Sequence, residues 1–334
     1  MAPENWEDSV TPNVTSSLHF NTSDGLTRET IPAFKLISAI FLLFTFVFGL
    51  VMNTLYLWVL SFRMRRSINT TWFFHFILGN LVFTLSIPFF TTYVIMRPHW
   101  IFKQFLCKVI NSLISLDMYL TVFVLTVISI DRFLLVFHPV WYRGHMNPQK
   151  ATVICLFLWF LALLFTAPYL VLRQVKYENN ITICYNDYTL SGRWNGQRVK
   201  WIMFTTRLFL GLLIPFVIIT ICYLQIIIKI SKENLAKSNK PYKIICIAIT
   251  SFFVCWTPYH VWYGMSAEPG RFPEGLLNAL NVLTTSLTCL NSCFTPIIYL
   301  FIAEDFKMMF KKSFLELIEL VLSEAFTSAN WTVG

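Results

Sequence analysis

Charged side chains are scarce in this sequence. Only 13% of the 334 residues are charged, whereas a soluble globular protein usually has about 25%. The sequence also has no Gly-rich phosphate loop, no paired histidines at metal-ligand spacing and no nucleophile elbow. We therefore expect neither an enzyme nor a protein that holds a metal or cofactor. Matching pairs of Gly/Pro-broken helices, which are typical of transporters, are missing as well.

Hydrophobic residues, by contrast, make up 56% of the chain. A membrane-spanning helix needs roughly 20 apolar residues, and the sequence has apolar runs of this length at 34–60, 70–96, 104–136, 150–171, 200–230, 240–266 and 275–302. The fold class predicted is an all-α membrane protein, a seven-transmembrane helix bundle. We expect an N-terminal tail over 1–33, the bundle over 34–302 and a cytoplasmic segment over 303–334.

The distribution of basic residues predicts the orientation of the bundle. Lys and Arg gather in the loops after the first, third and fifth runs, and such loops face the cytoplasm. The start of the chain is acidic and lacks the apolar core of a cleavable signal peptide. We therefore expect a multi-pass plasma membrane protein with an extracellular N-terminus. The second outer loop is an exception, because it has Arg193, Arg198 and Lys200.

Several features fit that orientation. Glycosylation sequons on the predicted outside begin at Asn13, Asn21 and Asn180. Cys107 and Cys184 both face the oxidising side, where a disulfide is favoured over two free thiols. The net charge of +9 comes mostly from inner loops, so it indicates contact with anionic membrane lipid rather than with nucleic acid.

The segment after the last run predicts a short amphipathic eighth helix. Phe306, Phe310 and Phe314 recur every four residues with lysines between them, which is typical of a helix lying on the inner leaflet. The tail beyond it offers few phosphorylation sites, Thr327 and Ser328 among them. Recruitment of arrestin through tail phosphates is left open on this sequence.

A set of motifs follows the seven runs in order. Its members are Asn53, Asp131-Arg132, Trp159, Pro215 with Tyr223, Cys255-Trp256 with Pro258, and Pro296 with Tyr299. This ordered set resembles the rhodopsin-like, or class A, G-protein-coupled receptors. Finer stretches such as "HPVW" and "KPYKII" resemble the chemoattractant branch, which includes the formyl-peptide and chemerin receptors and related orphans. The resemblance implies signalling through a heterotrimeric G protein, of the inhibitory type by analogy.

The resemblance also implies an activation switch. Arg132 pairs with Asp131 at rest and is released on activation, a two-state element of the kind that a switch needs. Trp256 would pass packing changes to the kink at Pro258, and Pro296 and Tyr299 belong to the same switch. The alternatives are a snorkelling charge for the Asp-Arg pair and an ordinary core aromatic for Trp256.

The ligand site is predicted around Arg207, a cation inside the fifth run with nothing acidic near it on that run. A buried Arg needs an anionic partner or water, so we expect a ligand with a carboxylate, either a peptide C-terminus or an acidic lipid. Arg173 is a second cation, unless it only snorkels at the membrane surface. His260 is a ligand contact or a satisfied core histidine. The expected apolar walls, unless these side chains serve bundle packing alone, are Tyr259, Tyr263, Phe90 and Trp100.

The chain departs from the family where relatives hold a sodium ion. Asn80 and Thr295 replace the usual polar groups, while Thr121, Asn291 and Ser292 remain. Asp117 lies one helical turn before Thr121 on the same face. Our hypothesis is that Asp117 supplies the missing negative charge; the alternative is a neutral, hydrogen-bonded Asp that serves packing only.

Two functions remain open on the sequence. The first is a signalling receptor for an anionic chemoattractant. The second is a decoy of the same fold that binds its ligand without signalling, which the altered Asn80 and Thr295 and the sparse tail favour. The intact Asp131-Arg132 and Trp256-Pro258 pairs favour the signalling receptor.

Overall fold

The computed structural model describes residues 33–302 apart from 97–98, 179, 233–239 and 269. For 33–34, 240–248, 274 and 294–302 it describes the backbone alone. Asn13, Asn21 and the predicted eighth helix lie outside the described residues.

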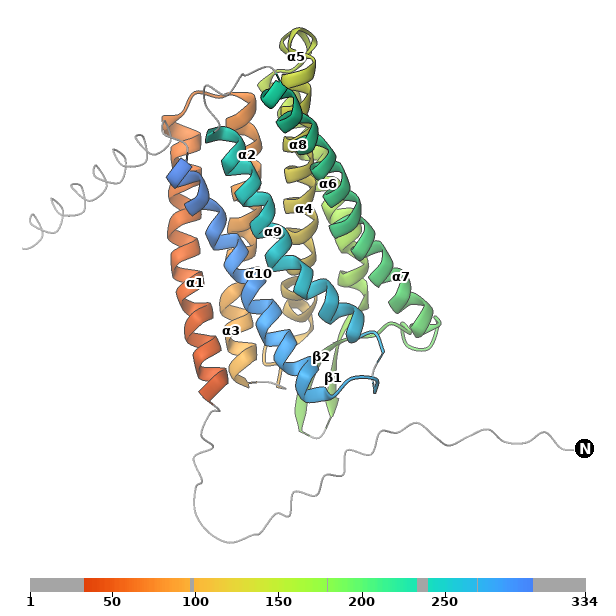
Figure 1. Ribbon diagram of the computed structural model, residues 1–334. Coiled ribbons are helices and arrows are strands. Elements are labelled where there is room, and N and C mark those ends of the chain that lie inside the picture. Colours follow the sequence, from red (N-terminus) through yellow and green to blue (C-terminus); the bar gives the residue numbers. More distant parts are fainter. Residues whose placement is uncertain (1–32, 97–98, 179, 233–239, 269, 303–334) are drawn as a thin grey trace, which may run out of the picture.

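Long helices arranged as a bundle make up most of the structure (Figure 1). They are α1 (Ala33–Trp58) with its π-helical extension η1 (Val59–Arg63), α2 (Ile68–Thr84), α3 (Ile87–Met96), α4 (Lys103–Phe137), α6 (Pro148–Leu172), α7 (Gly196–Leu208), η2 (Phe209–Leu213), α8 (Ile214–Lys232), α9 (Lys240–Met265) and α10 (Glu274–Ile302). With α2–α3 and α7–η2–α8 each counted as one span, the seven predicted runs are confirmed within the described ranges.

The lipid-facing sides of these helices are apolar. Ile37, Phe44 and Val153 are each about two-thirds exposed, at 67%, 65% and 66%. Five spans in the described part of the chain are long and apolar enough to cross a membrane, and α9 and α10 have 26 and 29 residues. An apolar exterior on helices of this length is typical of a protein whose solvent is a bilayer.

Prolines explain two of the breaks in the helices. Pro88 has no N–H to donate, and the chain turns just before it at Leu85 and Ser86, where the Ser86 hydroxyl donates to the Phe83 carbonyl at 2.6 Å. The π-helical turn η2 ends just before Pro215, and local π-helical adjustments re-satisfy the backbone groups that a proline frees in a membrane helix. Pro168 and Pro258 lie inside α6 and α9, which continue through them.

Three elements were not predicted. Strands β1 (Arg173–Glu178) and β2 (Ile181–Asn186) form an antiparallel hairpin that lies over one end of the bundle, called here the hairpin end. Cys184 of β2 is disulfide-bonded to Cys107 of α4, as expected. At the opposite end, helix α5 (Pro139–His145) begins with a proline in its first turn, a favoured position for that residue. We call this the α5 end.

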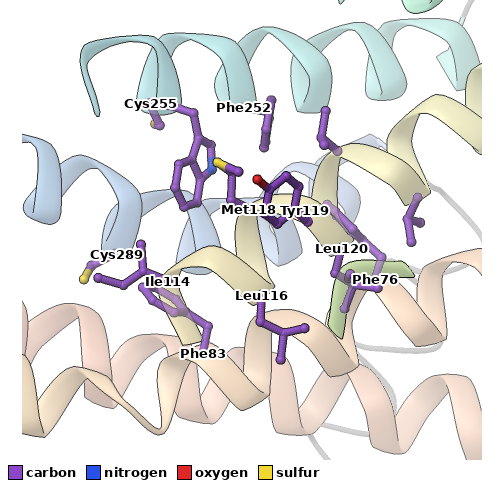
Figure 2. Close-up of a cluster of buried hydrophobic side chains, with 14 of the residues drawn as sticks. Phe76, Phe83, Ile114, Leu116, Met118, Tyr119, Leu120, Phe252, Cys255 and Cys289 are labelled. Atoms are coloured by element: carbon purple, nitrogen blue, oxygen red, sulfur yellow. The ribbon is translucent and has the colours of Figure 1, made fainter. Parts of the chain in front are cut away.

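The core is built around α4, which contacts α2, α6 and α8. Figure 2 shows Ile114, Leu116, Met118 and Tyr119 of α4 lying between α9 and α2. Gly79 lets α2 approach closely, because a Cβ there would lie 2.6 Å from Leu120 Cδ2. Small residues permit such close helix contacts in membrane proteins. Helix α4 therefore packs closely against its neighbours along the centre of the bundle.

Candidate functional site

A large cavity opens at the hairpin end of the bundle. Its volume is about 1170 Å³, and its walls come from α1, α3, α4, α9, α10 and the hairpin. The charged residues in its described lining are Lys35 and Arg173, and that lining includes no carboxylate. Amide side chains add polar groups, among them Asn111, Asn186, Asn278 and Asn281. The cavity is therefore basic and rich in hydrogen-bonding groups.

The structure divides the predicted ligand residues into two groups. Phe90, Trp100, Arg173 and Tyr259 line the cavity. Arg207, His260 and Tyr263 are buried, at 1%, 2% and 7% exposure, and they are not among the described lining residues. Tyr259 belongs to both groups, because its ring lies 4.6 Å from the Arg207 guanidinium carbon. One aromatic ring thus separates the cavity from Arg207.

Arg207 lies in a cage of three tyrosines, one from α6 and two from α9. Its guanidinium carbon is 5.3 Å from the ring centres of both Tyr169 on α6 and Tyr263 on α9. Its Nη1 atom donates a hydrogen bond to the Ser115 hydroxyl of α4 at 2.9 Å. The Nε and Nη2 atoms make no hydrogen bond within the described residues. We call this group, Arg207 with Tyr169, Tyr259, Tyr263 and Ser115, the arginine cage.

The cage compensates the buried charge only in part. A buried ion costs several kcal/mol after relaxation, and each cation–π contact returns about 0.5–2 kcal/mol. Each buried donor left without a partner costs a further 1–3 kcal/mol, and more when it is charged. The described groups that act on Arg207 electrostatically are phenols, with no carboxylate among them. Within the described residues, the charge of Arg207 is therefore compensated only in part.

The loop after the hairpin covers the cage. Tyr188 lies within 3.3 Å of the Tyr263 hydroxyl, oxygen to oxygen, and Asn186 donates to the Tyr188 hydroxyl at 2.9 Å. Next to it, Asp187 accepts hydrogen bonds from the Thr189 hydroxyl and the Ser191 backbone N–H, which lower the pKa of Asp187 below its ordinary value. This loop is thus tied into a fixed shape above the arginine cage.

Trp256 lies directly below the cavity wall. It is 0% exposed, and its ring meets Tyr259 edge-on at 5.7 Å and Phe252 at 6.0 Å between ring centres. Pro258 is inside the same helix, α9. A displacement of Tyr259 would therefore press on Trp256, next to the proline of α9.

The predicted ion region is buried and polar. Asn80, Thr121, Asn291 and Ser292 are each at most 2% exposed. The Asn80 side chain makes no hydrogen bond in the described part of the chain. The Ser292 hydroxyl donates to the Cys289 carbonyl at 2.8 Å. The side chain of Thr295 lies outside the described residues.

Asp117 is 2% exposed and lies in a narrow space with Gly79, Leu120 and Trp159. Neither carboxylate oxygen has a hydrogen bond of good geometry within the described residues. Asn80 and Asn291 are not part of the described lining of this space. The Asp117 side chain thus lies toward α2 and α6, and the hypothesis that it holds a cation stays a prediction.

The α5 end holds the predicted switch. Arg132 Nη2 lies 3.2 Å from Asp131 Oδ2, an ion pair in which that oxygen has no well-aligned hydrogen bond. Tyr142 of α5 donates to Asp131 Oδ1 at 2.6 Å, and Arg132 also donates to the Asn69 side chain of α2. Burial and the neighbouring Asp131 raise the pKa of Tyr142 above its ordinary value, so the phenol stays a donor. The side chains of Pro296 and Tyr299 lie outside the described residues.

Sequence reasoning missed several partners of the predicted residues. Tyr142 and Asn69 hold Asp131 and Arg132, and Ser115 and Tyr169 complete the arginine cage. A proline at the start of a loop helix, eight residues after Asp131, was a usable signal for Tyr142. Asn180, the described sequon, is exposed in the turn of the hairpin and accepts a hydrogen bond from Tyr177.

A sequence model of the family described as 7 transmembrane receptor (rhodopsin family) matches residues 33–299. The chain belongs to this family. It is therefore a receptor and not an enzyme, a multi-pass plasma membrane protein, and membership implies coupling to a heterotrimeric G protein.

Similar proteins place the receptor in the chemoattractant branch. "Probable G-protein coupled receptor 33" of Homo sapiens is 40% identical over 89% of this chain and 91% of its own length. "C3a anaphylatoxin chemotactic receptor" of Oncorhynchus mykiss is 37% identical over 84% and 78%. "Chemerin-like receptor 1" of Mus musculus is 35% identical over 83% and 77%. Each is named as a receptor, so the decoy alternative gains no support.

Proposed function

We propose that this receptor recognises an anionic chemoattractant at the hairpin end and signals through an inhibitory-type G protein at the α5 end. The hairpin end is then extracellular, as is the N-terminus. The observation that carries the proposal is the basic cavity, whose described lining has Lys35 and Arg173 and no carboxylate. One relative is named as a C3a anaphylatoxin chemotactic receptor and another as a chemerin-like receptor. These names support a peptide ligand.

The lining favours a peptide C-terminus over a fatty acid. Small-molecule pockets usually measure about 300–1,000 Å³, and this cavity is larger, at about 1170 Å³. Its amide side chains, such as Asn111, Asn186 and Asn281, match the donors and acceptors of a peptide backbone. The alkyl chain of a fatty acid has no hydrogen-bonding group to offer these amides, whereas a peptide backbone has one donor and one acceptor in each residue other than proline.

The proposed mechanism begins with attraction of the ligand carboxylate to Arg173. Displacement of Tyr259 then brings the carboxylate to the unpartnered Nε and Nη2 atoms of Arg207. Because Tyr259 meets Trp256 edge-on, the same displacement presses on α9 beside Pro258. An outward movement of α9 at the α5 end releases Arg132 from Asp131, and the freed cation contacts the G protein.

The experiment that tests this function is a screen with matched ligand pairs. Peptides with a free C-terminal carboxylate are compared with their C-terminal amides, and fatty acids with their methyl esters, in cells that report activation of inhibitory G proteins. We expect activation by carboxylate peptides and at least a tenfold loss of potency for their amides, about 1.4 kcal/mol.

The control for nonspecific attraction of anions is Arg193→Gln. Arg193 is an exposed cation in the loop between β2 and α7 and is not in the described cavity lining. This variant is expected to keep the preference for carboxylates. Equal potency of acids and amides would overturn the anionic ligand. Activation by fatty acids alone would overturn the peptide class.

A further inference from the structure

The arginine cage has hydrogen-bond donors without acceptors, and they lie deeper than any ligand in the cavity can reach without moving a side chain. Arg207 is 1% exposed, and its Nε and Nη2 atoms are unpartnered within the described residues. His260 is 2% exposed, its ring centre lies 6.4 Å from that of Tyr259 in the cage, and both of its ring nitrogens are unpartnered within the described residues. A neutral imidazole carries one N–H. At least three N–H donors thus lack an acceptor in one region.

The remaining contacts of Arg207 do not neutralise its charge. Ring faces and the Ser115 hydroxyl surround it, and these groups are dipoles and quadrupoles without net charge. The described groups acting on it include no carboxylate. A permanently charged guanidinium therefore stands in a low-dielectric site without a counterion from the described chain.

The cage is closed to large anions by its own tyrosines. Tyr259 separates it from the cavity, and the Tyr188–Tyr263 contact covers it on the side of the loop. The thioether of Met118 lies against Gly211, which His260 also approaches, and a methionine side chain adapts readily to a new neighbour. A monatomic anion fits this situation, whereas a carboxylate attached to a peptide must first displace Tyr259.

We propose that the arginine cage binds a halide ion, chloride under physiological conditions, as the counterion of Arg207 in the receptor without agonist. The Nε and Nη2 edge of Arg207 and the ring N–H of His260 are its donors. The inference shares Arg207 with the proposed ligand site but requires no agonist. In combination with the proposed function, the ligand carboxylate replaces the halide when Tyr259 moves.

The test is thermal unfolding of the purified full-length receptor without agonist. The midpoint Tm is measured in potassium gluconate, with gluconate replaced stepwise by chloride or bromide at constant ionic strength. A ligand that binds only the folded state raises stability in a saturable way. We expect both halides to raise Tm by about 2–4 °C, with half of the effect on the order of 10 mM.

Three variants locate the site. Arg207→Gln is expected to abolish the saturable halide shift. Arg173→Gln removes a cation of the cavity and is expected to keep the shift in full. Arg207→Lys retains a positive charge but loses the Nε–Nη2 edge, so its half-saturation concentration is expected to rise about tenfold, since each 1.4 kcal/mol of binding free energy is a factor of ten.

Each outcome decides something. Equal Tm in chloride and gluconate for the wild type overturns the proposal. So does a halide shift that persists in Arg207→Gln, or an unchanged half-saturation in Arg207→Lys should the glutamine variant fail to fold. A halide shift in a receptor that acidic peptides and lipids do not activate would overturn the proposed function and leave the halide site standing.

Discussion

Two arginines at opposite ends of the bundle differ in their partners. Arg132, at the α5 end, has Asp131 beside it in sequence and pairs with it at 3.2 Å. Arg207, at the hairpin end, has a hydroxyl and aromatic faces around it. A cation whose counterion belongs to the same chain can act as an internal switch. The fold can then hold the ion pair either formed or separated. In the proposed function, a cation without such a counterion serves recognition, because the ligand supplies the negative charge.

The largest expected effect comes from removing Arg207, which tests whether the two arginines have different roles. Arg207→Ala is expected to reduce the potency of an acidic agonist about 30-fold or more, since loss of one partner of a buried charge pair costs about 2–5 kcal/mol. Agonist-driven G-protein activation in cells measures it. The exposed Arg193→Gln is the control and is expected to stay within threefold of wild type, because surface charges contribute little. Unchanged potency in Arg207→Ala would refute the ligand role.

A second test gives Arg207 a carboxylate partner within the protein, as Arg132 already has. Ser115→Asp places a carboxylate where the Ser115 hydroxyl accepts from Nη1. The new ion pair would compete with any external anion, so we expect a loss of agonist potency of at least about tenfold. Cell-surface staining confirms expression of the variant.

Its matched control is Ser115→Ala, which removes the same hydrogen bond without adding charge. This control is expected to lose less than tenfold in agonist potency, because it adds no internal counterion and leaves the charge of Arg207 available to the ligand. Equal losses in the two variants would mean that the added charge does not matter.

At the α5 end, a smaller change sharpens the comparison. Tyr142→Phe removes the hydroxyl that donates to Asp131 at 2.6 Å and so loosens the tie between α5 and the resting ion pair. We expect basal nucleotide exchange on the G protein to rise about 5- to 10-fold, a shift of about 1 kcal/mol toward the active state. Membranes without agonist provide the measurement.

Trp141→Phe is the neighbouring control on α5, because the Trp141 ring stacks on His145. Basal exchange is expected to stay at the wild-type level in that variant. A fall in basal exchange in Tyr142→Phe would show that Tyr142 instead weakens the Asp131–Arg132 pair.

Asp117 presents the reverse case, a buried carboxylate without a well-formed hydrogen bond in the described chain. If it holds a cation, sodium lowers agonist affinity in the wild type and Asp117→Asn removes that effect, which is expected to be a few-fold. Agonist binding is compared in sodium and N-methylglucamine at constant chloride, so that the arginine cage sees no change. Sodium sensitivity that survives in Asp117→Asn would exclude the cation and leave the packing role.

The helical spans could be predicted because a bilayer demands long apolar runs. The run 104–136 and the helix α4, Lys103–Phe137, differ by one residue at each end. The hairpin and α5 carry no such signal, since short segments outside the bilayer depend on contacts with distant parts of the chain. Hence the disulfide of Cys107 was predictable from its compartment, whereas the shape of the loop it holds was not.

The sequence could single out Arg207 but not the arrangement of side chains around it. Arg207 was recognisable because a cation in an apolar run is costly. Its separation from the cavity by the ring of Tyr259 depends on side chains from α6, α7 and α9, which no periodicity encodes. Tyr142 and Ser115 were missed for the same reason: each acts through a partner on another helix.

Tyr259 is shared by both compartments at the hairpin end. One part of its surface lines the cavity, its ring face lies against Arg207, and its edge contact reaches Trp256. A bulky neutral compound in the cavity and a small anion in the cage would therefore push the same side chain from different sides without touching each other. Binding of either ligand would then shift the position of Tyr259 and so change the affinity for the other. The two would compete in a binding assay although their sites do not overlap.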